Sequence, residues 1–273
     1  MTSRVPFHPL LDLQRRRVVA HRGGAALRPE NTMAAFENGV ALGADALELD
    51  VHLSRDGVVV VCHDETVDRT TDGRGAIGDL ASRDLATLDA GYRFGGAEGF
   101  PFRGRGLAVP VLREVLERFT LPLIIELKGR NLDLAAAAVD EVRRARALGR
   151  VCFGSFSLAL LQAARACGAD VVTSAGKEEI RRALTWSYLA SLPPDRAYRA
   201  FQVPETHGRT RVVSRRFLRA TARAGVPVHV WTVNDPGDMR RLLVWGVRAL
   251  ITDRPDLGVA AVREFAETHK GSE

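Results

Sequence analysis

The most constraining feature of the sequence is a repeated pairing of short apolar runs with longer amphipathic segments. The runs are rich in Val, Ile and Leu, and most are followed by an Ala-, Arg- and Leu-rich stretch with helical periodicity. This alternation is typical of βα units that build a parallel sheet covered by helices. Eight strands are predicted in this way: Val18–His21, Ala46–Val51, Leu123–Leu127, Val151–Gly154, Asp170–Thr173, Ala200–Val203, Val226–Thr232 and Ala249–Thr252.

Eight such units predict an α/β fold, the (β/α)8 TIM barrel. The length of 273 residues fits one domain, since barrels of this kind use about 250 residues. We therefore expect a single domain over residues 1–273. Helices are expected between most of the strands, at Met33–Leu42, Leu112–Phe119, Leu134–Leu148, Leu158–Cys167, Arg215–Ala224, Pro236–Val244 and Leu257–His269.

Two stretches interrupt the repeat. Residues 64–110 are rich in Gly, Asp and Thr and are too long for a βα loop, which predicts a small inserted subdomain over one rim of the barrel. Residues 176–199 contain Trp186, Tyr188 and the pair Pro193-Pro194, and we expect a helical excursion there.

The net charge of +6 is compatible with attraction to nucleic acid, to an anionic membrane or to a phosphorylated substrate. The 39 basic residues include only three lysines, at 128, 177 and 270, and the many arginines are scattered. Scattered arginines favour a solvated surface, and no basic stripe interleaved with aromatic residues appears. We therefore expect no nucleic-acid partner.

The sequence also bears on location. It contains no run of roughly 18 apolar residues, and the segment Met1–Arg17 lacks the apolar stretch of a secretory signal. Cys62, Cys152 and Cys167 are odd in number, lack metal-ligand spacing and lie in apolar segments, which favours reduced thiols. We expect a cytoplasmic protein without stable membrane anchoring. The sequence does not indicate an oligomeric state.

Charged residues gather where the first two predicted strands end. His21 and Arg22 end the first strand, at the carboxyl end where barrel active sites form. In the second strand, the period-2 alternation turns Glu48, Asp50 and His52 to one face. Two buried carboxylates side by side are costly unless a cation neutralises them. Oxygen ligands predict a divalent metal ion, Mg²⁺ or Ca²⁺.

A hairpin is expected to return a second histidine to this place. Asp56-Gly57 lies between apolar runs and predicts a two-residue turn. Counting back along the ladder from this turn sets His52 opposite Val61 and Asp50 opposite His63. Opposed residues share a face, so His63 should point toward the carboxylates, and a shift of one residue would point it away.

The next barrel strand adds a third carboxylate. Glu126 and Lys128 lie two residues apart at its carboxyl end and should point the same way, either toward the site or into an ion pair with each other. Trp231 is expected to line the substrate pocket or to pack against the rim. Other strand ends that could line the pocket carry Ser155, Gln202 and Asn234.

Two histidines, three carboxylates, an arginine and a lysine at one barrel mouth fit phosphoryl chemistry. The chain resembles the glycerophosphodiester phosphodiesterase family nearly from end to end. The resemblance lies in His21-Arg22-Gly23, Pro29-Glu30-Asn31-Thr32 with Ala35-Phe36, Glu48-Leu49-Asp50-Val51, His63-Asp64, Ile125-Glu126-Leu127-Lys128, Ser155-Phe156, Val230-Trp231-Thr232-Val233-Asn234 and Ile251-Thr252-Asp253.

The resemblance implies roles for these residues. The divalent metal would be held by Glu48, Asp50 and Glu126, the acid/base pair would be His21 and His63, and the phosphate would be bound by Arg22 and Lys128. The implied reaction cuts a small-molecule glycerophosphodiester into sn-glycerol 3-phosphate and an alcohol.

Our mechanistic hypothesis is that the metal and Lys128 draw charge from the phosphate oxygens, while His21 deprotonates the nucleophile and His63 protonates the leaving alcohol. The two histidine roles could be exchanged. The nucleophile could be water, or the neighbouring glycerol hydroxyl by way of a cyclic phosphate.

Two other functions remain open. A lysophospholipase D or a sphingomyelinase D-like lyase would need an apolar groove, for which the insertion offers four aromatic residues that could equally form its own small core. A phosphate-binding module without catalysis is also conceivable, since fold does not dictate function. The four aromatic residues are Tyr92, Phe94, Phe100 and Phe102.

Overall fold

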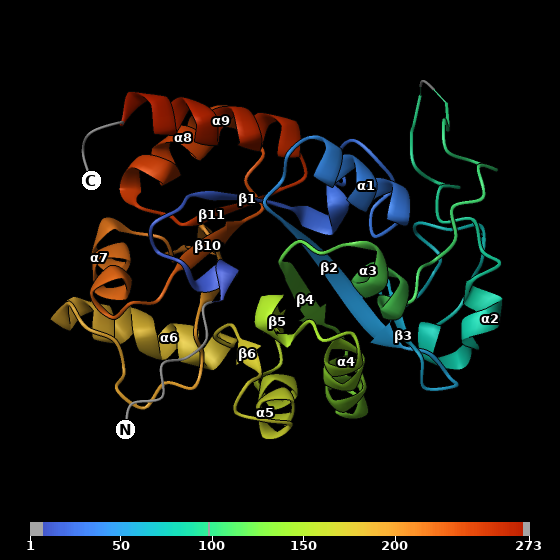
Figure 1. The fold of residues 1–273 in the computed structure, drawn as a ribbon, viewed down its shortest axis with the longest axis horizontal. Helices are drawn as coiled ribbons and strands as arrows, with labels where there is room; N and C mark the ends of the chain where they lie inside the picture. The colour runs from blue at the N-terminus through green and yellow to red at the C-terminus, as the bar shows by residue number, and fades with distance from the viewer. Residues whose placement is uncertain (1–7, 98, 270–273) are drawn as a thin grey trace.

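The chain folds into a barrel of parallel strands surrounded by helices (Figure 1). The computed structural model describes residues 8–97 and 99–269, so part of the segment Met1–Arg17 lies outside the described residues. The strands are ordered β6-β5-β4-β2-β1-β11-β10-β7, and a parallel bridge between Ser174 and Ala200 joins the two ends. The predicted barrel is confirmed. Its strands are β1 (Arg17–Ala20), β2 (Ala46–Leu53), β4 (Leu123–Leu127), β5 (Val151–Gly154), β6 (Val172–Thr173), β7 (Phe201–Pro204), β10 (Val228–Trp231) and β11 (Ala249–Thr252).

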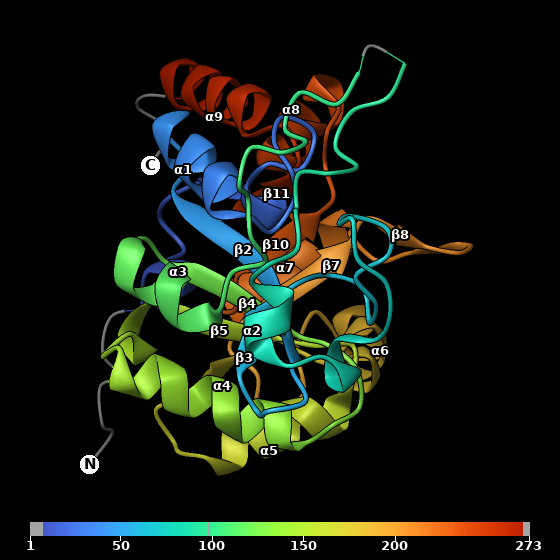
Figure 2. The ribbon, with the colours of Figure 1, turned by 90° about the vertical axis from the view of Figure 1, so that its right-hand side faces the viewer.

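Along the chain, a helix lies between each barrel strand and the next and another follows the last strand. Figure 2 shows helices packed around the outside of the strands. Capping side chains mark where several helices begin: Ser157, Ser214 and Asp235 each accept a hydrogen bond from a backbone N–H of the first turn. The helix α6 lies within residues 176–199, where a helical excursion was expected. The helices are α1 (Met33–Ala41), α3 (Leu112–Arg118), α4 (Asp133–Arg144), α5 (Leu158–Ala166), α6 (Lys177–Trp186), α7 (Arg215–Arg223), α8 (Pro236–Trp245) and α9 (Pro255–Thr268).

Alternate residues of each strand pack on opposite faces of the sheet. In β2, Leu47 and Leu49 pack outward into a core shared with α3 and α4. Inside the barrel, Val19, Ile124 and Ile251 pack together in a separate cluster. Because both faces are covered, the strands read as nearly continuous apolar runs in the sequence.

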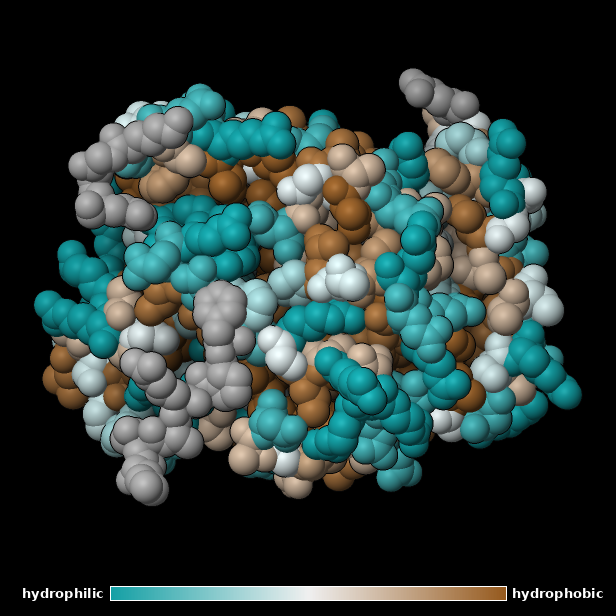
Figure 3. All heavy atoms as spheres, viewed as in Figure 1, coloured by the Kyte–Doolittle hydropathy of each residue, from teal (hydrophilic) through white to brown (hydrophobic). Residues whose placement is uncertain are grey.

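Charged side chains are spread over the surface. Figure 3 shows hydrophilic and hydrophobic residues interspersed across the face seen in Figure 1. Exposed arginines pair with nearby acids, as Arg113 does with Glu141 and Arg118 with Glu37. This arrangement agrees with the solvated surface expected from the scattered arginines. None of the helices in the described ranges is long and apolar enough to span a membrane.

The hairpin of β2 and β3 (Val59–Val61) has a different register from the predicted one. Val51 pairs with Val61 and His52 pairs with Val60, so the ladder is shifted by one residue. The turn has three residues because Ser54 N donates to Val58 O (3.0 Å), which leaves residues 55–57 as the loop. The Ser54 hydroxyl reinforces this turn through hydrogen bonds to Asp56 (2.7 Å) and Val58 O (3.0 Å). The prediction of a two-residue turn at Asp56-Gly57 was therefore wrong.

The described residues of the segment 64–110 pack beside the barrel mouth and include the short helices η3 (Ile77–Asp79) and α2 (Ser82–Leu85). Their core is aliphatic, and Val67, Ile77 and Leu85 pack against Val60 and Cys62 of the hairpin. The aromatic residues of this segment do not build that core. Phe94 and Phe102 make an edge contact with ring centroids 5.3 Å apart, and Phe100 is 42% exposed.

The amino ends of the barrel strands are closed by the chain before β1. Leu10, in the short helix η1 (Pro9–Leu11), is buried with the residues that fill the barrel. Two buried histidines attach this plug: Val151 O accepts a hydrogen bond from His8 Nε2 (3.1 Å), and Leu10 O accepts one from His229 Nε2 (3.1 Å). Burial lowers the pKa of His229 to about 4.

This buried histidine predicts a loss of stability in mild acid. The unfolded state takes up a proton near pH 6.5 and folded His229 only near pH 4, so stability falls as the pH drops between these values. At pH 4.5 the free energy of unfolding should fall by roughly 2 to 3 kcal/mol from this residue. The measurement is urea unfolding at pH 7 and pH 4.5 of the wild type and of His229→Gln, which keeps a donor but does not titrate. Equal pH sensitivity of the two proteins would contradict the prediction.

Candidate functional site

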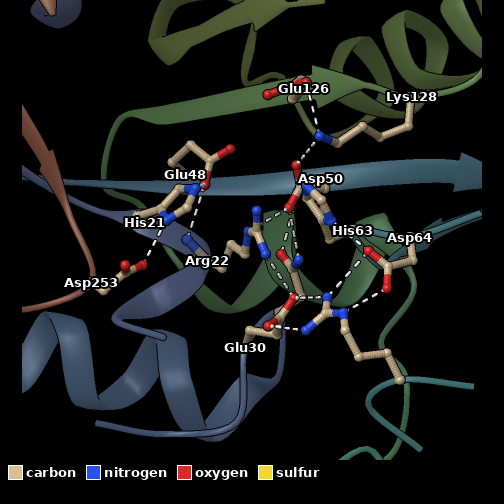
Figure 4. Close-up of polar contacts among 12 residues, drawn as sticks. His21, Arg22, Glu30, Glu48, Asp50, His63, Asp64, Glu126, Lys128 and Asp253 are labelled. Carbon is tan, nitrogen blue, oxygen red and sulfur yellow. Dashed lines mark hydrogen bonds and ion pairs between the residues drawn. The ribbon is translucent and has the colours of Figure 1, made fainter. Parts of the chain in front are cut away.

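The site begins at the turn that follows β1. His21 and Arg22 lie in the short helix η2 (His21–Gly23), in which Arg22 and Gly23 both have positive φ. Gly23 is required here, because a Cβ atom would lie 2.6 Å from the backbone of Ala35. The sharp turn lets His21 and Arg22 both reach the barrel mouth from consecutive positions, as the sequence predicted (Figure 4).

Three carboxylates converge at this mouth from two neighbouring strands. Asp50 of β2 lies beside Glu126 of β4 in the parallel ladder, and Glu48 precedes Asp50 by two residues on the same face. One ligand oxygen from each of the three lies within 4.8 Å of the others. Glu48 is 4% exposed and Asp50 is 1% exposed. The predicted convergence of these side chains is therefore observed.

The three carboxylates have different neighbouring charges, and the pKa values of Glu48 and Asp50 are shifted in opposite directions. Burial and the neighbouring Asp50 raise the pKa of Glu48 to about 8. Burial would also raise the pKa of Asp50, but Lys128 and Arg22 outweigh it and hold that pKa below its usual value. Lys128 Nζ lies 2.9 Å from both Asp50 Oδ1 and Glu126 Oε1, so the expected Glu126 pair exists but is shared with Asp50.

The donor set fits a divalent cation. All three groups offer carboxylate oxygens, the ligands that Mg²⁺ and Ca²⁺ prefer. Burial, and after it the nearby charge of Asp50, raise the pKa of Glu48, and a cation bound among the three carboxylates would favour its charged form.

His21 is held in place by an acid from the last strand. Asp253 accepts a hydrogen bond from His21 Nδ1 (2.6 Å), and Asn234 Nδ2 donates to the other oxygen of Asp253 (2.8 Å). Nε2 of His21 lies 3.9 Å from Glu48. Burial opposes protonation of His21, but Glu48 and Asp253 together raise its pKa. Sequence reasoning gave Asp253 no role, although it is the first residue after β11 and therefore lies at the same rim.

His63 reaches the site by a route other than the predicted one. The observed register sets Cys62 beside Asp50, with Cys62 N donating to Asp50 O (3.0 Å). The chain leaves the ladder after Val61, and His63 lines the same pocket as His21. Asp64 accepts a hydrogen bond from His63 Nδ1 (2.6 Å). The bend after β3, and not the expected pairing with Asp50, thus directs His63 toward the site.

The loop before α1 supplies two residues whose function sequence reasoning missed. Asn31, at a positive φ of 57°, donates through Nδ2 to Asp50 Oδ2 (2.9 Å) and accepts from Asp50 N (3.3 Å). Glu30 accepts a hydrogen bond from Arg22 Nη1 (2.9 Å). The sequence did contain a signal for these two residues: the motif Pro29-Glu30-Asn31-Thr32 contributed to the family resemblance, but Glu30 and Asn31 were given no role.

A pocket of about 390 Å³ extends from these residues along the barrel mouth. Trp231 lines it and makes an edge contact with Phe156, with ring centroids 5.7 Å apart. Ser155 and Gln202 also line it, as the sequence suggested, whereas Asn234 instead hydrogen-bonds to Asp253. The far wall comes from α6 and from the hairpin of β8 (Thr206–His207) and β9 (Thr210–Arg211).

The insertion aromatics do not line this pocket. Phe94 instead lines a separate hollow together with Glu30 and Arg69. Of the two alternatives left open for these aromatic residues, the apolar groove is therefore not observed, and the apolar residues of the pocket come from α6 and the barrel strands.

The sequence and the structure were compared with those of known proteins, and the matches are consistent with the site described above. The sequence model described as "Glycerophosphoryl diester phosphodiesterase family" matches residues 21–257. The chain belongs to this family. The predicted phosphoric diester hydrolase is thereby confirmed as the class of enzyme, and a module without catalysis is not supported.

Relatives in the family match over nearly the whole chain. A glycerophosphodiester phosphodiesterase of Bacillus subtilis is 31% identical over 91% of this chain and 87% of its own length. One from Caldanaerobacter subterraneus is 33% identical over 90% of this chain and 98% of its own. A glycerophosphodiester phosphodiesterase of Agrobacterium tumefaciens, of known structure, is 29% identical with a TM-score of 0.74, and the match covers 90% of this chain and 99% of the other. An Oleispira antarctica phosphodiesterase, solved with the product sn-glycerol-3-phosphate, is 25% identical with a TM-score of 0.73 and covers 91% and 97%.

Proposed function

We propose that the chain hydrolyses glycerophosphodiesters to sn-glycerol 3-phosphate and an alcohol in a metal-dependent reaction that uses His21 and His63 for proton transfer. One observation carries this proposal: two imidazoles, each hydrogen-bonded through Nδ1 to an aspartate, lie at one mouth with a trio of carboxylates (Figure 4). The complex of the Oleispira antarctica relative with sn-glycerol-3-phosphate supports the choice of product.

Glu48, Asp50 and Glu126 would hold the metal, Mg²⁺ or Ca²⁺. When bound, such an ion supplies positive charge that stabilises the phosphate oxygens in the transition state. The cationic side chains of Arg22 and Lys128 would also bind the phosphate and stabilise its negative charge.

The aspartates orient the two imidazoles for proton transfer. With Nδ1 of His21 donating to Asp253, and Nδ1 of His63 donating to Asp64, each Nε2 is the ring nitrogen left to face a substrate. One imidazole would accept the proton of the nucleophile and the other would donate a proton to the leaving alcohol. Trp231 would form the part of the pocket wall that lies beside the substrate.

We also propose that the substrate is a small molecule taken from solution and that the protein is cytoplasmic. The modest volume of the pocket, about 390 Å³, supports the first statement, and the three free cysteines support the second.

Removal of either imidazole should nearly abolish turnover. His21→Ala and His63→Ala should each lower kcat by roughly 10²- to 10⁴-fold, because proton transfer by a positioned side chain contributes that much. The assay is glycerol 3-phosphate release from glycerophosphocholine. His269→Ala, exposed at the end of α9 and outside the lining of this pocket, is the control and should change kcat little. Near-full activity of either catalytic variant would refute the assignment.

Metal binding should depend on all three carboxylates. Calorimetric titration of the apo protein with Mg²⁺ or Ca²⁺ should give one site per chain, and Glu126→Gln should weaken it by at least about tenfold, since a charged ligand is lost. Glu141→Gln, on the outer helix α4, is the control. Unchanged affinity in Glu126→Gln, or wild-type turnover in excess chelator, would contradict the metal site.

A second candidate substrate, a lysophospholipid, is favoured by the apolar wall of the pocket. Ile180 and Leu184 lie one turn apart on α6 and both line the pocket, beside Phe156 and Val212. A human lysophospholipase D is 28% identical over 87% of this chain and 83% of its own length. The acyl chain would then lie along α6.

This candidate predicts a selective effect of polar substitutions on α6. Leu184→Gln should lower kcat/KM for lysophosphatidylcholine by roughly tenfold, because apolar burial is lost, and should change that for glycerophosphocholine little. Both substrates are assayed with the wild type and the variant, with Thr185→Gln as the control on the exposed face of the same helix. Absence of lysophosphatidylcholine turnover, or equal losses for both substrates, would remove this candidate.

A further inference from the structure

Arg69 of the insertion connects two carboxylates that belong to different parts of the site. Its Nη1 and Nη2 donate to the two oxygens of Glu30 (2.8 and 2.7 Å). Its Nε and Nη2 donate to the two oxygens of Asp64 (2.6 and 3.2 Å). One guanidinium thus makes a forked contact with each carboxylate, which fixes their relative position.

Each carboxylate in turn holds a residue of the proposed reaction. Glu30 accepts a hydrogen bond from Arg22 (2.9 Å), the proposed phosphate ligand. Asp64 accepts one from His63 (2.6 Å), one of the two proposed proton-transfer groups. A continuous chain of charged contacts therefore runs from Arg22 to His63, and Arg69 is its central member. Figure 4 labels Arg22, Glu30, Asp64 and His63 of this chain.

The charges of this chain have a consequence for an anionic substrate. Without Arg69, the buried side of Glu30 would pair with Arg22 alone, and Asp64 would lose the cation that pairs with it. Hydrogen bonding to Arg69 keeps the pKa of Asp64 at about 2 and contributes to the lowered pKa of Glu30, so both groups carry negative charge near neutral pH. Without Arg69, Glu30 would keep Arg22 as its cation while Asp64 would lose its arginine, so the site would present one positive charge less to an anionic phosphodiester.

A simple surface ion pair would not support a functional role, since such pairs contribute little. Arg69 differs because each of its contacts is forked and because both carboxylates are also used by other residues of the site. The side chain is 49% exposed, so its removal creates no cavity in the core. Its loss should therefore affect the geometry of the site more than the folding of the chain.

We propose that Arg69 is a positioning residue, which sets His63 and Arg22 at the correct distance from each other by bridging Asp64 and Glu30. This inference rests on the proposed function. Arg69 acts through its two carboxylates and does not itself contact the substrate. The insertion thereby contributes to the reaction by supplying the bridge, although it does not line the pocket.

The test is Arg69→Met, compared with Arg83→Met, an exposed arginine of the same insertion whose side chain is 85% exposed. Arg69→Met should lower kcat/KM for glycerophosphocholine by roughly 10- to 100-fold, because small displacements of catalytic groups cost about this much. We expect a lower kcat from the misplaced His63 and a higher KM from the weakened phosphate site. A merely structural role would reduce the folded fraction and leave KM unchanged.

Arg69→Lys separates charge from geometry. Lysine restores the positive charge but lacks the fork, so KM should recover while kcat stays low. The ring signals of His63 in NMR spectra should shift in Arg69→Met and remain unchanged in Arg83→Met.

The proposal is overturned if Arg69→Met keeps kcat/KM within twofold of Arg83→Met, or if Arg69→Lys restores kcat completely. Failure of the proposed function is a different result: the wild type itself, or Arg83→Met, would then fail to turn over any glycerophosphodiester in the presence of metal.

Discussion

Three carboxylates that share one end of the barrel repel one another, and much of the surrounding structure compensates for this repulsion. Glu48 and Asp50 are buried, so water screens them little. The positive groups that face them come from other segments: Arg22 from the turn after β1, and Lys128 from the end of β4. The negative cluster therefore requires cationic side chains close to it. The barrel brings them close because all its parallel strands end at the same rim.

The parts of the fold that could be predicted from sequence follow from local periodicity. The alternation in β2 and β4 places Glu48, Asp50 and Glu126 on one face whatever the rest of the chain does, so their convergence needed only the assumption of adjacent parallel strands. The βα repeat likewise identified the barrel before any helix boundary was fixed.

The rest depended on contacts that periodicity does not encode. The hairpin register was decided by the hydroxyl of Ser54, which favoured a three-residue loop over the Asp56-Gly57 turn. The partner of His21 lies 232 positions away, at Asp253. Arg69 looks like any other arginine in a sequence rich in them, and only its two carboxylates, which come from separate segments, distinguish it. Long-range pairs of this kind cannot be read from spacing.

The barrel is least securely joined between β6 and β7. The strand β6 has two residues, shares two pairs with β5, and meets the next strand only through the bridge of Ser174 with Ala200. Ser174 also lines the pocket, directly before the helix that forms its apolar wall. A seam with so few backbone hydrogen bonds can widen at low energetic cost, whereas the side that carries the carboxylates is held by five consecutive pairs between β2 and β4. Backbone pairing is thus sparse along the wall beside α6 and dense along the wall that carries the three carboxylates.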